Sequence, residues 1–347
     1  MKKVLNPIRN QGSSKKVLIT GIAGFAGSHL AEYLYSQKFT VFGFFLSNHL
    51  LLNLSHLKDK INLIECDLLD SKKVEKSVKL INPDYVFHLA AFSSPKDSFK
   101  NPKETLKNNI FGQINLLEAL AKIKSNAKIL IVGSADEYGQ VDSKYLPIKE
   151  KTPLSPISPY AVSKVAQDML GLQFFLHYGL QIVRVRPFNH IGPRQSLSFV
   201  VPSFTAQIAA LEKKGGGIIK VGNLKNSRDF TDVRDMVRAY LRSLEKGKTG
   251  EVYNIGSGKA VKIADILRMM IGLSKVKIIV KKDTKRIPPQ DIDTIYCNYS
   301  KFKKTTGWQP QIPIIQTLSD TIEYERLRVS RESRVPQAPR ALSQKSS

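Results

Sequence analysis

The chain of 347 residues can bury a sizeable core in one large or two moderate domains, and its content of 42% hydrophobic and 24% charged residues is ordinary for a globular protein. No run of about 18 apolar residues is present, which argues against a membrane-spanning helix, and the basic segment 1–16 lacks the apolar core of a secretory signal. The two cysteines, Cys66 and Cys297, are too few for a disulfide framework or a complete zinc site, so we expect a cytoplasmic protein without a metal.

The net charge of +25 requires an interpretation. The basic residues are scattered, and no basic motif interleaved with aromatic residues is present, so nucleic acid is an unlikely main partner. A positive surface would also attract an anionic substrate such as a nucleotide diphosphate.

The first predicted element is a strand over 16–20, followed by a glycine turn and an amphipathic helix from Ser28. The turn has the pattern G-x-x-G-x-x-G, whose glycines allow a tight turn, close approach of a pyrophosphate and close packing of helix on strand. A purely structural glycine turn is the alternative. The residues predicted to contact a dinucleotide here are Gly21, Gly24, Phe25, Ala26 and Gly27.

Strands and helices continue to alternate along the chain. Apolar runs predict further strands over 39–45, 61–66, 84–89, 128–132 and 180–186, with a long helix over 101–121. This alternation predicts an α/β fold with a doubly wound parallel (Rossmann) sheet, which binds ligands at the carboxyl ends of its strands.

The end of the second strand bears on the choice of cofactor. Segment 43–48 has no acidic residue to hold the ribose 2′-hydroxyl of NAD and no arginine to hold a 2′-phosphate. NADPH is therefore mildly favoured, and NADH remains possible.

After the sixth strand the elements become shorter and mixed. Helices are expected over 199–213 and 232–244, and strands over 218–221, 251–255 and 276–280. We expect a smaller mixed α/β C-terminal portion that is interleaved with the first domain and covers a cleft. The predicted organisation is a basic extension (1–15), a dinucleotide-binding domain with interleaved later segments (16–187), a mainly substrate-binding portion (188–328) and a disordered tail (329–347).

A candidate catalytic set comes from two segments. Tyr160 and Lys164 stand four residues apart, so both project from one face of a helix, and the ammonium should lower the pKa of the phenol. Ser134 follows the fifth strand and would hydrogen-bond the substrate oxygen that Tyr160 protonates, while Lys164 holds the nicotinamide ribose. Each feature alone could be a coincidence, and Ser134 could merely close a turn, but all occur in the expected order.

The glycine loop, this catalytic set and segments 66–68, 88–91, 109–112 and 115–119 together resemble the extended short-chain dehydrogenases/reductases, over residues 16–328. The resemblance implies that Asp67 and Leu68 contact the adenine and that His190 lies beside the nicotinamide. It also implies a cofactor wall formed by Leu89, Ala90 and Ala91.

Later segments (186–195, 221–224, 228–235 and 306–308) are most similar to the GDP-6-deoxy-4-keto-D-mannose reductase family. This resemblance implies NADPH-dependent reduction of the C4 ketone of GDP-4-keto-6-deoxy-D-mannose to GDP-D-rhamnose. Arg228 would bind the diphosphate, and Arg286 and Asp291 the nucleoside, which suits guanidinium and carboxylate chemistry. The full implied substrate set is Ser134, Asp136, Asn189, Val200, Arg228, Arg286 and Asp291.

Several alternatives stay open. Arg228 and Asp229 could form a local ion pair before a helix capped by Asp232, and Asn189–His190 could be a simple turn. A GDP-mannose 4,6-dehydratase is the nearest functional competitor, because Asp136 stands where such enzymes carry a glutamate, although Ile191-Gly192 follows the reductases. A nucleotide-sugar 4-epimerase, and a cofactor-sensing or RNA-associated protein of the same fold, are further alternatives.

The helix that carries Tyr160 also predicts the assembly. Met169, Leu172, Phe174 and Phe175 appear as apolar surface beyond what its own core needs. Since a helix of this kind pairs subunits in the resembling families, we expect a homodimer.

Overall fold

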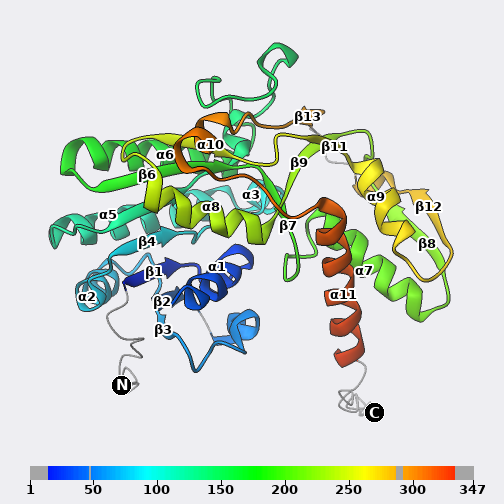
Figure 1. The fold of residues 1–347 in the computed structure, drawn as a ribbon, viewed down its shortest axis with the longest axis horizontal. Helices are drawn as coiled ribbons and strands as arrows, with labels where there is room; N and C mark the ends of the chain where they lie inside the picture. Colours follow the sequence, from blue (N-terminus) through cyan, green and yellow to red (C-terminus); the bar gives the residue numbers. More distant parts are fainter. Residues whose placement is uncertain (1–14, 47, 287–291, 333–347) are drawn as a thin grey trace, which may run out of the picture.

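The computed structural model describes residues 15–46, 48–286 and 292–332 (Figure 1). The strands are β1 (Lys16–Thr20), β2 (Thr40–Phe45), β3 (Asn62–Glu65), β4 (Tyr85–His88), β5 (Lys128–Val132), β6 (Gln181–Pro187), β7 (Asn189–Ile191), β8 (Gly217–Val221), β9 (Ser227–Asp232), β10 (Val252–Ile255), β11 (Ala260–Lys262), β12 (Ile278–Lys282) and β13 (Thr294–Ile295). The helices are α1 (Phe25–Ser36), α2 (Ser71–Ile81), α3 (Pro95–Lys100), α4 (Pro102–Leu106), α5 (Gly112–Lys122), α6 (Pro159–Tyr178), α7 (Val200–Lys213), α8 (Val233–Lys246), α9 (Ile263–Gly272), α10 (Ser300–Thr306) and α11 (Ile314–Glu332).

The larger part of the molecule is built on a seven-stranded sheet in the order β10-β6-β5-β4-β1-β2-β3. Every neighbouring pair is parallel, so all the carboxyl ends meet at one edge. The predicted doubly wound Rossmann sheet is confirmed. The strands over 16–20 and 128–132 have the predicted bounds, and the other predicted strands of this sheet differ by one residue at one end or at both ends.

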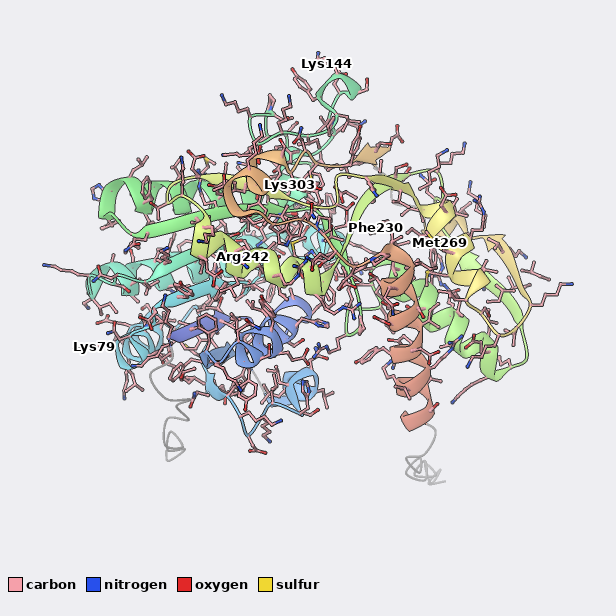
Figure 2. All side chains as sticks on the ribbon, viewed as in Figure 1. Lys79, Lys144, Phe230, Arg242, Met269 and Lys303 are labelled. Atoms are coloured by element: carbon pink, nitrogen blue, oxygen red, sulfur yellow. The ribbon has the colours of Figure 1, made fainter. Side chains whose placement is uncertain are left out.

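Helices cover both faces of this sheet, because alternate strand residues point to opposite sides. In β1, Val17 and Ile19 pack into one core with α1, α8 and α10, while Leu18 packs into the other with α2, α5 and α6. In Figure 1 the strands follow one another from β6 down to β3 with these helices alongside them, and Figure 2 shows the side chains between them.

The helix predicted over 101–121 is interrupted. A π-helical turn, Lys107–Phe111, separates α4 from α5. The turn directs Asn109 inward, where its amide accepts from the Phe92 main-chain N–H (2.8 Å) and donates to Ser163 Oγ on α6 (2.8 Å). The wider turn thus supplies a buried polar bridge that a regular helix would not provide.

Later segments return to the larger part of the fold. Strand β10 forms its seventh strand beside β6, and α8 packs against α1. Both elements lie within 188–328, the portion that was expected from the sequence to be mainly substrate-binding but interleaved with the first domain. Helix α11 continues to Glu332, so 329–332 are helical rather than a disordered tail, and the rest of that predicted tail lies outside the described residues.

The smaller part has its own core among α7, α9, α11, β8 and β9. It contains a parallel pair, β8 with β12, and a sheet in which β9 contacts β7, β11 and β13. The strand predicted over 276–280 begins two residues later. This part lies beside the carboxyl edge of the large sheet (Figure 1).

The prediction of an exposed apolar surface on α6 is partly wrong. Phe174 is 5% exposed and packs in the core under the large sheet, and Phe175 is partly buried against the same core. Met169 is exposed, at 40%. The homodimer therefore stays a prediction, and the exposed apolar surface of α6 that supports it is smaller than expected.

Among the described residues, no helix has both the length and the apolar character needed to span a bilayer.

A buried charge cluster joins α6 to β6. Asp168 accepts from Arg184 Nη1 (2.7 Å) and Arg186 Nε (2.9 Å), and all three side chains are less than 10% exposed. Charges in such a place need their partners, because water does not solvate them.

We predict that Asp168→Asn destabilises the fold by about 3–5 kcal/mol, because the buried Arg184 guanidinium loses its carboxylate partner and Arg186 keeps only Glu137. Urea unfolding followed by circular dichroism measures the free energy of unfolding. The control is Glu75→Gln, which breaks the exposed Lys122–Glu75 pair (2.8 Å) and should cost less than about 1 kcal/mol. Equal losses in the two variants would contradict the importance of the cluster.

Candidate active site

A cleft of about 1900 Å³ runs between the carboxyl edge of the large sheet and the smaller part. Phe230, labelled in Figure 2, lies on β9 where the two parts meet and contributes to the lining. The predicted site residues found in this lining are Gly21, Gly24, Phe25, Ala26, Gly27, Asp67, Leu68, Leu89, Ala90, Ala91, Ser134, Asp136, Tyr160, Lys164, Asn189, His190, Val200, Arg228 and Arg286. Asp291 lies outside the described residues.

The glycine loop forms one end of the cleft. Gly21 has φ +71°, and a Cβ there would lie 2.9 Å from the main chain of Ala90. A Cβ on Gly27 would lie 2.2 Å from the Gly21 carbonyl oxygen. These positions therefore require glycine, and α1 begins directly after Gly24 with its positive end beside the cleft, which suits an anionic phosphate.

The loops that follow β3 and β4, on either side of β1 and β2 in the sheet, continue this wall. The Leu68 carbonyl oxygen accepts from Asn115 Nδ2 (2.8 Å), which fixes the loop after β3. The loop after β4 is fixed by Thr20 Oγ1, which accepts from the Ala90 N–H (3.2 Å).

The predicted catalytic trio comes together. Ser158 caps the N-terminus of α6, so Tyr160 and Lys164 project from its first two turns, and both are buried. Lys164 Nζ donates to the Val132 carbonyl oxygen (2.8 Å) and lies 6.0 Å from the centre of the Tyr160 ring.

Ser134 lines the cleft and also has a structural role. It is the N-cap of η3 (Ala135–Tyr138), a 3₁₀ turn, and its Oγ accepts from the Asp136 N–H (3.1 Å). An oxygen that accepts in this way keeps its own proton available for donation. Closing a turn and polarising a carbonyl are thus compatible roles.

The expected effect of Lys164 on Tyr160 is not found. Burial raises the pKa of Tyr160, and the charge of Asp136 raises it further, against a smaller lowering by the Ser134 hydrogen bond. Burial also lowers the pKa of Lys164, to about 8. Because the ammonium is bonded to the Val132 carbonyl, desolvation outweighs any stabilisation of a phenolate.

Arg228 does not pair with Asp229 within the described residues. The Asp229 carboxylate is buried and accepts from the main chain of Ser257 (2.7 Å) and Gly258 (2.9 Å). The ion-pair alternative is therefore wrong, although Asp232 does cap α8. Arg228 faces Asp136, whose pKa is raised by burial and lowered by the nearby guanidinium.

The remaining substrate-side residues lie around the same region. Asn189 and His190 form strand β7 rather than a turn. The His190 ring stacks on Phe25 of the glycine loop, at 5.7 Å between centres. Arg286 is half-exposed and bonds Asp283 (3.4 Å), and Lys220 and Lys285 also line this end, which makes it cationic.

Two further residues at this site were not identified from the sequence. Arg194 lines the cleft and binds both carboxylate oxygens of Glu32 (2.6 and 2.7 Å), which ties a distant loop to α1. Glu137 is fully buried behind Ser134. The Ser-x-x-Glu pattern of a capping box was the signal that could have found it.

The comparisons with known proteins agree with this arrangement. A family model described as GDP-mannose 4,6 dehydratase matches residues 18–321. The GDP-6-deoxy-D-mannose reductase of Pseudomonas aeruginosa is 36% identical over 92% of this chain and 100% of its own length. The GDP-mannose 4,6-dehydratase of Yersinia enterocolitica is 27% identical over 89% of this chain and 93% of its own.

Solved structures give the same result. RMD from Pseudomonas aeruginosa complexed with NADPH superposes with a TM-score of 0.80 at 32% identity, covering 91% of this chain and 100% of that one. A UDP-glucose 4-epimerase from Thermotoga maritima with UDP-glucose has a TM-score of 0.80 at 29% identity, covering 90% and 99%. With the family model spanning nearly all the described fold, the chain belongs to the GDP-mannose 4,6-dehydratase family.

Proposed function

We propose that this protein is an NADPH-dependent oxidoreductase that reduces the C4 ketone of GDP-4-keto-6-deoxy-D-mannose to GDP-D-rhamnose. The observation that carries the proposal is a buried tyrosine that keeps its proton, beside a serine and a lysine, in one cleft with a glycine loop. The 36% identity to a GDP-6-deoxy-D-mannose reductase, over that protein's full length, supports the same reaction.

The residues present fit a nicotinamide dinucleotide. Gly21 and Gly27 leave the space that a Cβ would fill, and the N-terminus of α1 opens beside it. The glycine loop would hold the pyrophosphate, Asp67 and Leu68 the adenosine part, and Lys164 the nicotinamide ribose. When bound, NADPH would supply the hydride.

The chain's own residues would supply the proton and the positioning. Ser134 donates its hydroxyl hydrogen to the ketone oxygen, which fixes and polarises the carbonyl group. Tyr160 then gives its phenolic proton to the alkoxide that develops on that oxygen. The raised pKa of Tyr160 suits this direction, since the group stays protonated at neutral pH.

The cationic end of the cleft supports a nucleoside diphosphate sugar. Arg228, Arg286 and Lys220 line it together, and guanidinium groups bind diphosphate oxygens through paired hydrogen bonds. The guanine base is supported by the family and by the named relatives.

A GDP-mannose 4,6-dehydratase is the second candidate. Asp136 supports it, because this partly buried carboxyl lines the cleft with a raised pKa and could act as an acid and a base. Such an enzyme recycles its nicotinamide, whereas the proposed reductase consumes it.

We therefore expect the purified protein to oxidise NADPH when GDP-4-keto-6-deoxy-D-mannose is added, measured as a fall in reduced-nicotinamide absorbance. The dTDP- and UDP-linked 4-keto sugars serve as controls for the base and should react more slowly. Conversion of GDP-mannose without loss of NADPH would identify the dehydratase instead.

Tyr160→Phe should lower kcat by about 10²–10⁴-fold, because the alkoxide loses its proton donor. The dissociation constant of NADPH, measured by fluorescence titration, should change little, since the ring is kept. A comparable loss of cofactor binding would mean that Tyr160 is not the proton donor.

The pH dependence should reflect Lys164. Its pKa lies near 8, so the ammonium is present at neutral pH and is lost as the pH rises through that value. We expect kcat/KM for the ketone to fall above about pH 8, because kcat/KM reports groups of the enzyme before it binds that substrate. In Lys164→Arg the guanidinium stays charged, so the remaining activity should not fall above pH 8. If kcat/KM of this variant still falls with rising pH, another group causes the fall.

A further inference from the structure

The loop that carries Ser134 rests on a buried carboxyl group. Glu137 has no exposed surface, and its Oε1 accepts from the Ser134 main-chain N–H (2.8 Å). It does not line the cleft, so it touches neither the cofactor nor the substrate region.

Gly133 leaves the space that this carboxyl group occupies. A Cβ on residue 133 would lie 2.2 Å from Glu137 Oε1 and 3.1 Å from the Val185 carbonyl oxygen. Any side chain there would displace the carboxyl from the Ser134 N–H. Gly133, Ser134 and Glu137 therefore form one unit.

The other oxygen of the carboxyl group faces the charge cluster, where it forms an ion pair without a hydrogen bond. Glu137 Oε2 lies 2.9 Å from Arg186 Nε, and Arg186 also bonds Asp168 on α6. Arg186 Nη1 donates to the Tyr138 hydroxyl (3.0 Å), which donates to Asn254 Oδ1 on β10 (2.7 Å). Residues of α6, β6 and β10 thus contact the loop that carries Ser134 on the side away from the cleft.

The same group is coupled electrostatically to the site. Burial and Asp168 raise the pKa of Glu137 well above its ordinary value, against a smaller lowering by Arg186 and the Ser134 N–H. In its ionised form Glu137 would raise the pKa of both Tyr160 and Lys164.

We propose that Glu137 is a positioning residue that acts through Ser134: its carboxyl oxygen holds the serine main chain so that the hydroxyl hydrogen is directed to the substrate carbonyl oxygen. The proposal rests on the proposed reduction for its kinetic test. Its geometry stands independently of that reaction.

The test compares Glu137→Gln and Glu137→Met, each alone and combined with Ser134→Ala. The amide oxygen of Gln still accepts the Ser134 N–H, so its kcat should stay within a few-fold of the wild type. Met fills the space without an acceptor, so kcat should fall by about 10²-fold, the usual cost of a lost polarising donor, with NADPH binding unchanged. In the Ser134→Ala background, Glu137→Met should produce no further loss.

A matched control is Asp235→Leu, which removes another fully buried carboxylate that accepts two main-chain N–H groups (2.8 Å each). It should lower the melting temperature but not change kcat. The proposal would be overturned if Glu137→Met lowered kcat equally in the wild type and in the Ser134→Ala background. It would also be overturned if Glu137→Gln lowered kcat as much as Glu137→Met.

A structural measurement separates this proposal from the proposed reaction. Crystal structures of Glu137→Met and of Gly133→Ala should show the Ser134 hydroxyl displaced from its wild-type position. A hydroxyl that stays in place in either variant would overturn the role of Glu137, even if the wild type reduces no ketone. Should the Met variant fail to fold, Gly133→Ala and Glu137→Gln carry the test.

Discussion

The parallel pairing of β1 with both β2 and β4 is the constraint on which the cleft depends. Chain connections run outward in opposite directions from this strand, so the loops after β1 and β4 separate and leave a crevice between them. The glycine loop occupies one side, and its Gly21 main chain packs against Ala90 on the other. A dinucleotide site at this point follows from the strand order before any side chain is considered.

The second part of the site depends on buried charge. Asp168 and Glu137 lie with Arg184 and Arg186 between α6 and β6, beneath the loop that carries Ser134. Such a cluster adds little net stability compared with apolar packing, but it leaves few alternative arrangements, since each charge needs its partner. Its value here is that α6, which carries Tyr160 and Lys164, is fixed relative to β5 and Ser134.

The sequence was sufficient where a local pattern determines the structure. Alternating apolar runs, the glycine turn and the Tyr-x-x-x-Lys spacing each depend on neighbouring residues, so the sheet and the trio could be predicted. Contacts between distant segments could not. Arg194 reaches Glu32 across the chain, and β10 joins the large sheet beside β6, because of tertiary packing that no local pattern records. The pKa of Tyr160 was predicted in the wrong direction for the same reason, since burial is a property of the fold.

Asp136 and Glu137 show how one short turn can give two adjacent acids opposite roles. The 3₁₀ turn begins at Ser134, so the third residue after it points back to the cap and the second points outward. Glu137 is therefore used by the main chain and Arg186, while Asp136 faces the cleft and Arg228. A residue at position 136 can vary with the chemistry of the substrate without disturbing the support at 137. This separation lets one acid face the cleft at position 136 while the adjacent acid supports the Ser134 main chain, so a change at the first need not disturb the second.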